Sequence, residues 1–382
     1  MAAAHRGLGM IAGITLLGLG VTACSSAGPV TSTETLEIAA VTRTADCPKP
    51  PAPGGPPGGS VPIAKTVKPT STRSSTVIVP DGPQIRCGKE QVTMRQDIVY
   101  ASPVVGGVRH DLRLDLQIPR TKGPKPLVVY ITGGGFQMAD KTNNLNQRTY
   151  VAEQGYAVAS IEYRTTRTGS TYRDGVADVK SAIRYLRAHA DELGIDTGRV
   201  AVWGQSAGGY LAAMTGATNG REQFEQGDNL DRSSDVQAVV DQFGTHDLAR
   251  TADDFDAETR ALYMAPNSSI NAYVFGPNSN RTVLTDRAAN RAANPATYLS
   301  RSSAPFVLLH GDSDRIISPS QSLILLDALK AKRVPGTRYV IKGADHGDLA
   351  FLGDPEAGKK WTTQKVMGTI TRFLDRELRN RR

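Results

Sequence analysis

Residues 200–214 constrain the fold of this 382-residue chain more than any other segment. A β-prone run, Val200 to Trp203, leads into Gly204-Gln205-Ser206-Ala207-Gly208, and a small-residue helical pattern follows. A Gly-x-Ser-x-Gly pentapeptide between a strand and a helix is typical of a turn that exposes a nucleophilic serine. The N-terminus of the following helix carries partial positive charge, which favours a developing oxyanion. The alternative is a glycine-rich turn with an incidental serine, and the rest of the sequence is needed to distinguish the two interpretations.

Strand-like and helix-like patterns alternate along most of the chain. Apolar runs predict strands at 97–101, 111–119, 127–131, 157–162, 200–203, 236–242, 306–310 and 338–341. Helical spacing predicts a helix that includes 150–154 and further helices at 174–193, 320–332 and 361–378. The first two strands are expected to form an antiparallel hairpin through Gly106-Gly107 at the sheet edge. The alternation indicates an α/β fold with a mostly parallel sheet and helices on both faces.

The alternation lapses between 245 and 304, where Asp, Asn, Ala and Arg are frequent. A connection of this length inside a compact domain is usually functional. We therefore expect residues 245–304 to form a cap or lid insertion, with a decorative surface insertion as the alternative.

A serine nucleophile needs a base and an acid that orients it. Strand 306–310 is followed by Gly311-Asp312-Ser313-Asp314, and strand 338–341 by Gly343-Ala344-Asp345-His346-Gly347. Both groups would emerge at the carboxyl ends of parallel strands, where α/β sheets place their sites. His346 is the predicted base, and Asp312, Asp314 and Asp345 are the candidate acids.

The strand at 127–131 leads directly into Thr132-Gly133-Gly134-Gly135-Phe136. Glycines allow backbone N–H groups to approach a substrate oxygen closely. Gly134 and Gly135, together with the N–H of Ala207, are predicted to form an oxyanion hole. No Gly-Lys-Ser/Thr follows the triplet, so a phosphate-binding P-loop is excluded.

From about Leu127 to its end, the chain resembles the α/β-hydrolase esterases and lipases related to hormone-sensitive lipase, and the feruloyl-esterase-like carboxylesterases. Residues 129–136 are similar to the family's His-Gly-Gly-Gly segment and 155–164 to its third core strand; 194–209 resemble the approach to its elbow and 294–322 its acid segment. The sequence departs from the family at Thr132, where His is usual, and at Gln205, where an acidic residue is commoner.

The resemblance implies a serine carboxylesterase of α/β-hydrolase fold that acts on a small-molecule ester. Its catalytic residues would be Ser206, His346 and Asp314. Asp314 is the implied acid because the family's acid follows the Gly of His-Gly-x-x-Asp by three residues. No metal or organic cofactor is expected. The insertion has few large apolar residues, which favours short to medium acyl chains over long-chain lipids.

Two alternatives belong to other functional classes. The first is a serine peptidase of the prolyl-oligopeptidase type, which the lack of a propeller pattern before the catalytic region disfavours. The second is a catalytically silent binding protein on a hydrolase scaffold. Such proteins usually lose a triad member, and Ser206, Asp314 and His346 are all present.

The N-terminal region predicts export. In residues 1–23 a His-Arg pair precedes an apolar run that ends in Val21-Thr22-Ala23, followed by Cys24. This looks like a bacterial lipoprotein signal, which implies cleavage before Cys24 and a lipid anchor to the cell membrane on that cysteine. A plain secretory signal is the alternative.

The remaining two cysteines, Cys47 and Cys87, are predicted to pair in an oxidising compartment, with two free thiols as the alternative. The bridge would contribute roughly 4 kcal/mol in the chain-entropy model. Residues 24–90 are rich in Pro, Gly, Ser and Thr and are predicted to be a tether, leaving 91–382 as the catalytic domain. The net charge is +8, but the basic residues are not interleaved with aromatic ones, so nucleic-acid binding is not expected.

Overall fold

The structure, a computed structural model, describes residues 35–37, 45–49, 61–347 and 356–380. All of these residues belong to one unit of the chain, which spans 34–382. The predicted signal peptide and Cys24 lie outside the described residues. Within the described ranges, no helix combines the length and the apolar character needed to cross a membrane.

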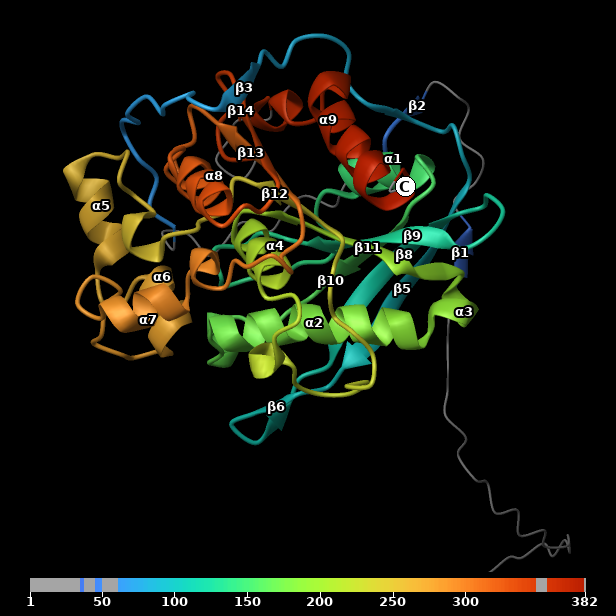
Figure 1. Cartoon of the computed structure of the whole chain (residues 1–382), viewed down its shortest axis with the longest axis horizontal. Helices are drawn as coiled ribbons and strands as arrows, with labels where there is room; N and C mark the ends of the chain where they lie inside the picture. The colour runs from blue at the N-terminus through green and yellow to red at the C-terminus, as the bar shows by residue number, and fades with distance from the viewer. Residues whose placement is uncertain (1–34, 38–44, 50–60, 348–355, 381–382) are drawn as a thin grey trace, which may run out of the picture. The chain divides into compact units, whose positions relative to one another are not determined.

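In the described part of the chain, ten strands form one sheet (Figure 1). In spatial order they are β1 (Thr35–Glu37), β5 (Val92–Ala101), β8 (Leu112–Pro119), β10 (Ala157–Ile161), β9 (Lys125–Ile131), β11 (Ile195–Gln205), β12 (Ala238–Gln242), β13 (Phe306–Gly311), β14 (Gly336–Ile341) and β3 (Ser75–Ile78). Neighbours from β10 to β3 are all parallel, whereas β1, β5, β8 and β10 pair antiparallel. The predicted mostly parallel sheet with an antiparallel opening edge is confirmed.

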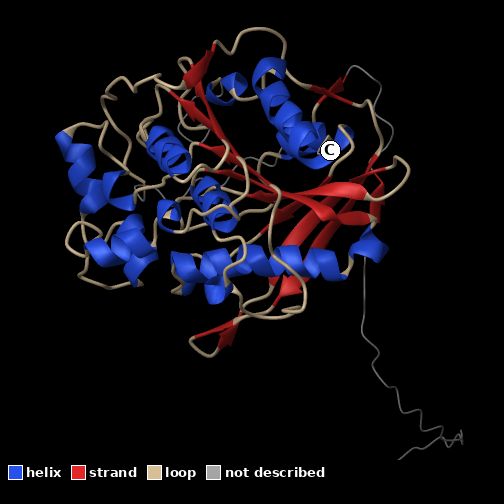
Figure 2. Ribbon diagram, in the orientation of Figure 1, coloured by secondary structure: helices blue, strands red, loops and turns tan. Residues whose placement is uncertain are grey.

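The helices of the described residues lie on both faces of this sheet and beside one end of it (Figure 2). They are α1 (Leu145–Glu153), α2 (Tyr172–Ala188), α3 (Ala190–Leu193), α4 (Ala207–Ala217), α5 (Ala257–Met264), α6 (Ser269–Phe275), α7 (Arg287–Ala292), α8 (Gln321–Ala331) and α9 (Gln364–Leu374), which a π-helical turn, Asp375–Arg379, extends. Two-stranded ribbons form between β2 (Ala45–Asp46) and β4 (Arg86–Cys87), and between β6 (Val104–Val105) and β7 (Val108–Arg109).

The side-chain alternation of the central strands creates two cores. In β9, Leu127, Val129 and Ile131 pack with α2, α4 and α8 in one cluster. Val128 and Tyr130 pack with α1 and α9 in the other. Because both faces are covered, β9 is buried along its whole length, which explains its continuous apolar run.

The structure differs from the predicted tether over residues 61–90. β3 adds to the sheet as the parallel neighbour of β14, with Ser75 opposite Arg338 and Ile78 opposite Ile341. Arg338 is fully buried, and its guanidinium donates to the Ser75 hydroxyl (2.9 Å) and the Ser71 carbonyl (2.8 Å). The free edge of β14 supplies backbone partners, so a segment with little apolar surface of its own becomes ordered there.

The predicted disulfide between Cys47 and Cys87 is confirmed; the two cysteines are 40 positions apart in the sequence. It lies beside the short β2–β4 ribbon, in which Ala45 pairs with Cys87. Both cysteines are buried, and they belong to the core cluster that contains α1 and α9. The bridge therefore fastens the segment around residue 47 to the body of the catalytic unit.

The insertion between β12 and β13 contains α5, α6 and α7, which the sequence patterns did not predict. Each of these helices begins after a residue whose side chain accepts a hydrogen bond from the N-terminal turn. In Figure 1 the three helices gather beside α8 and α4, beyond the end of the sheet. The predicted 174–193 helix is divided at His189 into α2 and α3.

Candidate active site

Ser206 occupies the turn between β11 and α4. Its backbone has φ 56° and ψ −122°, a strained combination for a residue with a side chain. Its N–H donates to the carbonyl of Gln242 on the neighbouring strand at 2.9 Å. A Cβ added to Gly204 would lie 2.0 Å from the Gly208 carbonyl oxygen, and one added to Gly208 would lie 2.0 Å from that of Ile131. The two glycines are therefore required by the close approach of strand, turn and helix.

His346 reaches the serine from the loop after β14. Its Nε2 lies 2.8 Å from Ser206 Oγ, and its Nδ1 lies 2.8 Å from Asp314 Oδ2. The imidazole is nearly buried, and the ring of Phe243 packs against it with centroids 4.7 Å apart. The structure thus brings together three predicted residues from the ends of β11, β13 and β14.

The other two candidate acids bind groups of the surrounding loops rather than the imidazole of His346, and Asp345 Oδ1 accepts from the backbone N–H of His346 at 2.8 Å. Asp312 accepts hydrogen bonds from the backbone N–H of Gly343 at 2.6 Å and from the Ser313 hydroxyl. Asp345 is paired with Arg315, whose Nε lies 2.5 Å from Asp345 Oδ2. Both carboxylates link the loop after β13 to the loop after β14, and neither contacts the His346 ring.

Asp314 is fully buried and remains a strong hydrogen-bond acceptor. Its Oδ1 accepts from the backbone N–H groups of Ile316 (2.9 Å) and Ile317 (2.8 Å). Burial by itself would raise the pKa of this carboxyl, but His346 and His310 together hold the pKa well below its ordinary value. The side chain is consequently an anion facing His346 Nδ1, which suits it to orient an imidazole.

The glycine triplet lies against the serine. A Cβ on Gly133 would come within 3.0 Å of Ser206 Cβ, and Gly134 and Gly135 have φ values of 150° and 60°. Among the described residues, the N–H groups of Gly134, Gly135 and Ala207 find no hydrogen-bond acceptor. Free N–H groups beside a serine hydroxyl are the arrangement that can stabilise a tetrahedral oxyanion.

Comparison with known proteins identifies the family. The BD-FAE family matches residues 114–329, which is more than half of the chain. The chain belongs to the BD-FAE family.

Individual relatives and a solved structure agree with this assignment. The chain is 31% identical to a probable isoprenylcysteine alpha-carbonyl methylesterase of Arabidopsis thaliana over 268 residues, 69% of this chain and 53% of the relative. It is 29% identical to esterase LipC of Mycobacterium tuberculosis over 228 residues, 59% of this chain and 53% of the relative. A truncated carbohydrate esterase from gut microbiota has a TM-score of 0.63 at 21% identity, with 77% of this chain and 99% of that chain covered. The predicted α/β-hydrolase fold is confirmed, and the chain spans about half the length of the curated relatives.

This BD-FAE member supports the glycine-rich loop at 132–136 without the histidine that is usual at position 132. The carbonyl of Thr132 accepts from the Tyr163 hydroxyl at 3.0 Å, and its side chain accepts from Asn143 at 3.3 Å. Phe136 stacks on Tyr273 of α6, with ring centroids 4.1 Å apart. The insertion therefore packs directly on the loop. These contacts support the loop although no histidine is present at position 132.

Gln205, the second departure from the family pattern, belongs to a buried amide network. Its Nε2 donates to Gln147 Oε1 at 3.0 Å and to Gln242 Oε1 at 2.9 Å, and Gln242 also accepts from the Trp203 indole. The neutral amide of Gln205, next to Ser206, links strand β11 to α1 and β12 without adding charge there.

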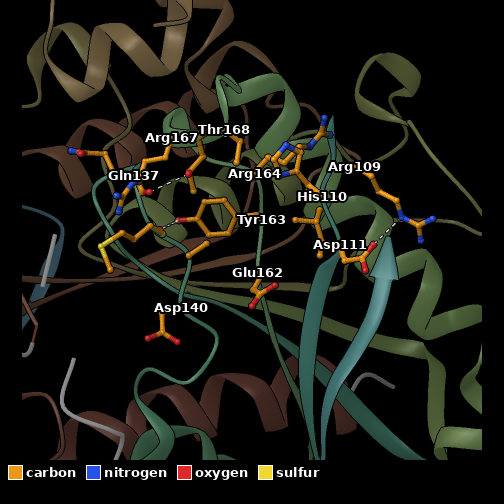
Figure 3. Close-up of a pocket in the computed structure, with 14 residues that line it drawn as sticks. Arg109, His110, Asp111, Gln137, Asp140, Glu162, Tyr163, Arg164, Arg167 and Thr168 are labelled. Atoms are coloured by element: carbon orange, nitrogen blue, oxygen red, sulfur yellow. Dashed lines mark hydrogen bonds and ion pairs between the residues drawn. The ribbon is translucent and has the colours of Figure 1, made fainter. Parts of the chain in front are cut away.

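A cavity of about 630 Å³ lies between residues 137–140, which follow the glycine-rich loop, and the segment after β10 (Figure 3). Tyr163, which supports Thr132, forms part of its wall. The figure shows acidic side chains, among them Glu162, and basic ones, among them Arg109 and Arg167, around the cavity.

Proposed function

We propose that the protein is a serine carboxylesterase that uses Ser206, His346 and Asp314. The observation that carries the proposal is the continuous hydrogen-bonded line from Ser206 Oγ through His346 to Asp314, with both contacts at 2.8 Å. A nucleophile in contact with a base, which is itself oriented by an acid, is the arrangement required for acyl transfer. The esterase names of the curated relatives support the same reaction class.

The proposed reaction has two halves. Ser206 Oγ forms a bond to the ester carbonyl carbon as His346 Nε2 accepts the hydroxyl proton, and the carbonyl electrons move to an oxyanion facing Gly134, Gly135 and Ala207. The carbon–oxygen bond to the alcohol then breaks, and His346 returns the proton to the leaving alkoxide. Water, deprotonated by His346, attacks the acyl-enzyme, and the acid leaves as Ser206 recovers its proton.

Asp314 serves both halves without changing its own charge. Its Oδ2 requires a hydrogen on His346 Nδ1, which leaves Nε2 free to accept a proton from the serine. The imidazolium that forms during catalysis is stabilised by the buried carboxylate, which burial keeps away from solvent screening. No step in this sequence requires a metal or an organic cofactor.

We expect hydrolysis of p-nitrophenyl esters to rise, peak and fall as the acyl chain lengthens from acetate to palmitate. Most large apolar residues of the insertion are buried, and only Leu262 and Leu284 are largely exposed among its residues. The insertion therefore presents no broad apolar surface to a lipid phase. Each additional methylene contributes at most about 0.8 kcal/mol until the pocket is filled.

The series is measured below and above the solubility limit of each ester. A maximum at palmitate with a jump in rate at that limit would instead identify an interfacial lipase. Prolyl-peptide substrates belong in the same experiment, since their cleavage would favour the peptidase alternative.

We also propose that the mature protein is held at the cell membrane by lipid on Cys24. The support is the pattern of residues 1–24 in the sequence, with small residues before the cysteine. Replacing Cys24 by alanine is expected to move the protein from the membrane fraction to the soluble fraction, because the acyl chains provide the anchor. Mass spectrometry of the mature N-terminus gives the direct measurement, and cleavage elsewhere or an unmodified N-terminus would contradict the proposal.

A further inference from the structure

The carboxylate of Asp314 binds a second imidazole besides that of His346. His310, on β13, places its Nε2 3.1 Å from Asp314 Oδ2, the same oxygen that contacts His346 Nδ1 at 2.8 Å. Oδ1 is occupied by the N–H groups of Ile316 and Ile317. The two oxygens therefore have four donors between them, and two of these donors are histidine nitrogens.

The surroundings of His310 determine which of its ring nitrogens carries hydrogen. Its Nε2 also lies 3.2 Å from the carbonyl oxygen of Ile317, which can only accept a hydrogen bond. Nε2 is consequently the protonated nitrogen, and it donates toward both Asp314 and Ile317. His310 is fully buried, and its Nδ1 has no hydrogen-bond partner among the described residues.

The shared oxygen sets the direction in which the carboxylate points. Rotation about the Cβ–Cγ bond of Asp314 moves both carboxylate oxygens together, so a donor on Oδ2 adds a second restraint to the one that the N–H groups of Ile316 and Ile317 place on Oδ1. His310 stands on the rigid strand β13, paired on both sides by β12 and β14. His346, in contrast, stands on a loop after β14.

We propose that His310 is a positioning residue of this active site, which holds Asp314 Oδ2 in the orientation that His346 requires. The inference rests on the proposed function, in which Asp314 selects the tautomer of His346. His310 contacts neither the serine nor the substrate carbonyl; it acts through Asp314. It connects the Asp314 end of the hydrogen-bonded line to strand β13 of the central sheet.

The test compares two side chains of similar length at position 310. In glutamine the amide nitrogen is as many bonds from Cα as His310 Nε2 is, so His310→Gln keeps the donor. Methionine has a similar reach and no donor, so His310→Met removes it. We expect His310→Met to lower kcat roughly 10- to 100-fold while KM stays within about twofold, and His310→Gln to restore most of the lost kcat.

Folding is monitored by thermal unfolding of both variants. If His310→Met does not fold, His310→Asn takes its place, because its shorter amide cannot reach Asp314, and it is expected to be as impaired as the methionine variant. Equal kcat for the donor-bearing and donor-lacking variants would overturn the proposal.

A second readout does not depend on turnover. In protein labelled with ¹⁵N-histidine, the Nδ1 proton of His346 reports its hydrogen bond to Asp314. Its resonance is expected to shift in His310→Met and to lie near the wild-type position in His310→Gln. An unchanged resonance in His310→Met would contradict the positioning role. Because this signal can be measured in a protein that hydrolyses no ester, failure of the proposed function is distinguished from failure of this inference.

Discussion

The Ser206→Ala protein is expected to lose ester hydrolysis by about 10⁶-fold in kcat, as measured when other serine hydrolases lose their nucleophile. The substitution removes the only atom that would form the acyl bond, while the N–H groups of the oxyanion loop remain in place. The thermal midpoint is expected to change little, because the Ser206 backbone hydrogen bond to Gln242 is retained and alanine adds no atoms.

Ser313→Ala is the matched control. Ser313 is exposed on the loop that carries the acid, and its hydroxyl contacts Asp312 rather than His346. This variant should keep kcat within about twofold of the wild-type value, since the exposed Ser313 side chain contacts none of Ser206, His346 and Asp314 and surface substitutions of this kind have small effects. A Ser206→Ala protein that still hydrolyses p-nitrophenyl acetate near the wild-type rate would remove Ser206 from the mechanism.

Asp314→Asn is expected to lower kcat by about 10⁴-fold, in line with the loss of the orienting acid in serine proteases. Its amide oxygen will remain with the N–H groups of Ile316 and Ile317, which require an acceptor. The amide nitrogen then faces His346 Nδ1 and donates to it. That arrangement selects the imidazole tautomer with hydrogen on Nε2, which cannot accept the serine proton.

The same substitution at Asp312 is the control for the removal of a nearby carboxylate. Asp312 anchors the Gly343 N–H, so Asp312→Asn is expected to cost at most about tenfold in kcat through altered loop position. The two variants are compared by kcat and by thermal unfolding in the same buffer. Greater damage from Asp312→Asn than from Asp314→Asn would reassign the acid.

The sheet was predictable because its central strands are buried on both faces. Residues such as Val128 and Val129 alternate between two apolar cores, so β9 reads as a continuous apolar run. β3 was not predictable in this way. Its Val77 is 46% exposed, and the strand exists because β14 offers backbone partners from a distant part of the sequence. The local sequence pattern of residues 75–78 does not indicate such a pairing at the edge of a sheet.

The helices of the insertion had a local signal that periodicity did not reveal. Asp256, Ser268 and Asp286 each accept a hydrogen bond from the third residue of the helix that follows. These capping residues were visible in the sequence. The helices themselves are only six to eight residues long, too short for a stripe of apolar residues to repeat.

The principal site residues were predictable because motif and topology agree. Ser206 lies in a recognisable turn, and Asp314 and His346 follow strands whose carboxyl ends meet at one sheet edge. His310 was missed, although it is the first residue of the His-Gly-x-x-Asp segment that indicated Asp314. Because it lies within a buried strand, only the structure reveals that its ring turns toward the acid.

The most direct measurement of the central claim is covalent labelling with a fluorophosphonate, followed by peptide mapping. The reagent reacts with a serine that a neighbouring base activates, whatever the natural ester. We predict one adduct per chain, located on Ser206, with loss of ester hydrolysis in proportion to labelling. The Ser206→Ala protein should take up no label. Ester hydrolysis that persists in fully treated enzyme, or an adduct on another residue, would contradict the assignment of Ser206 as the nucleophile.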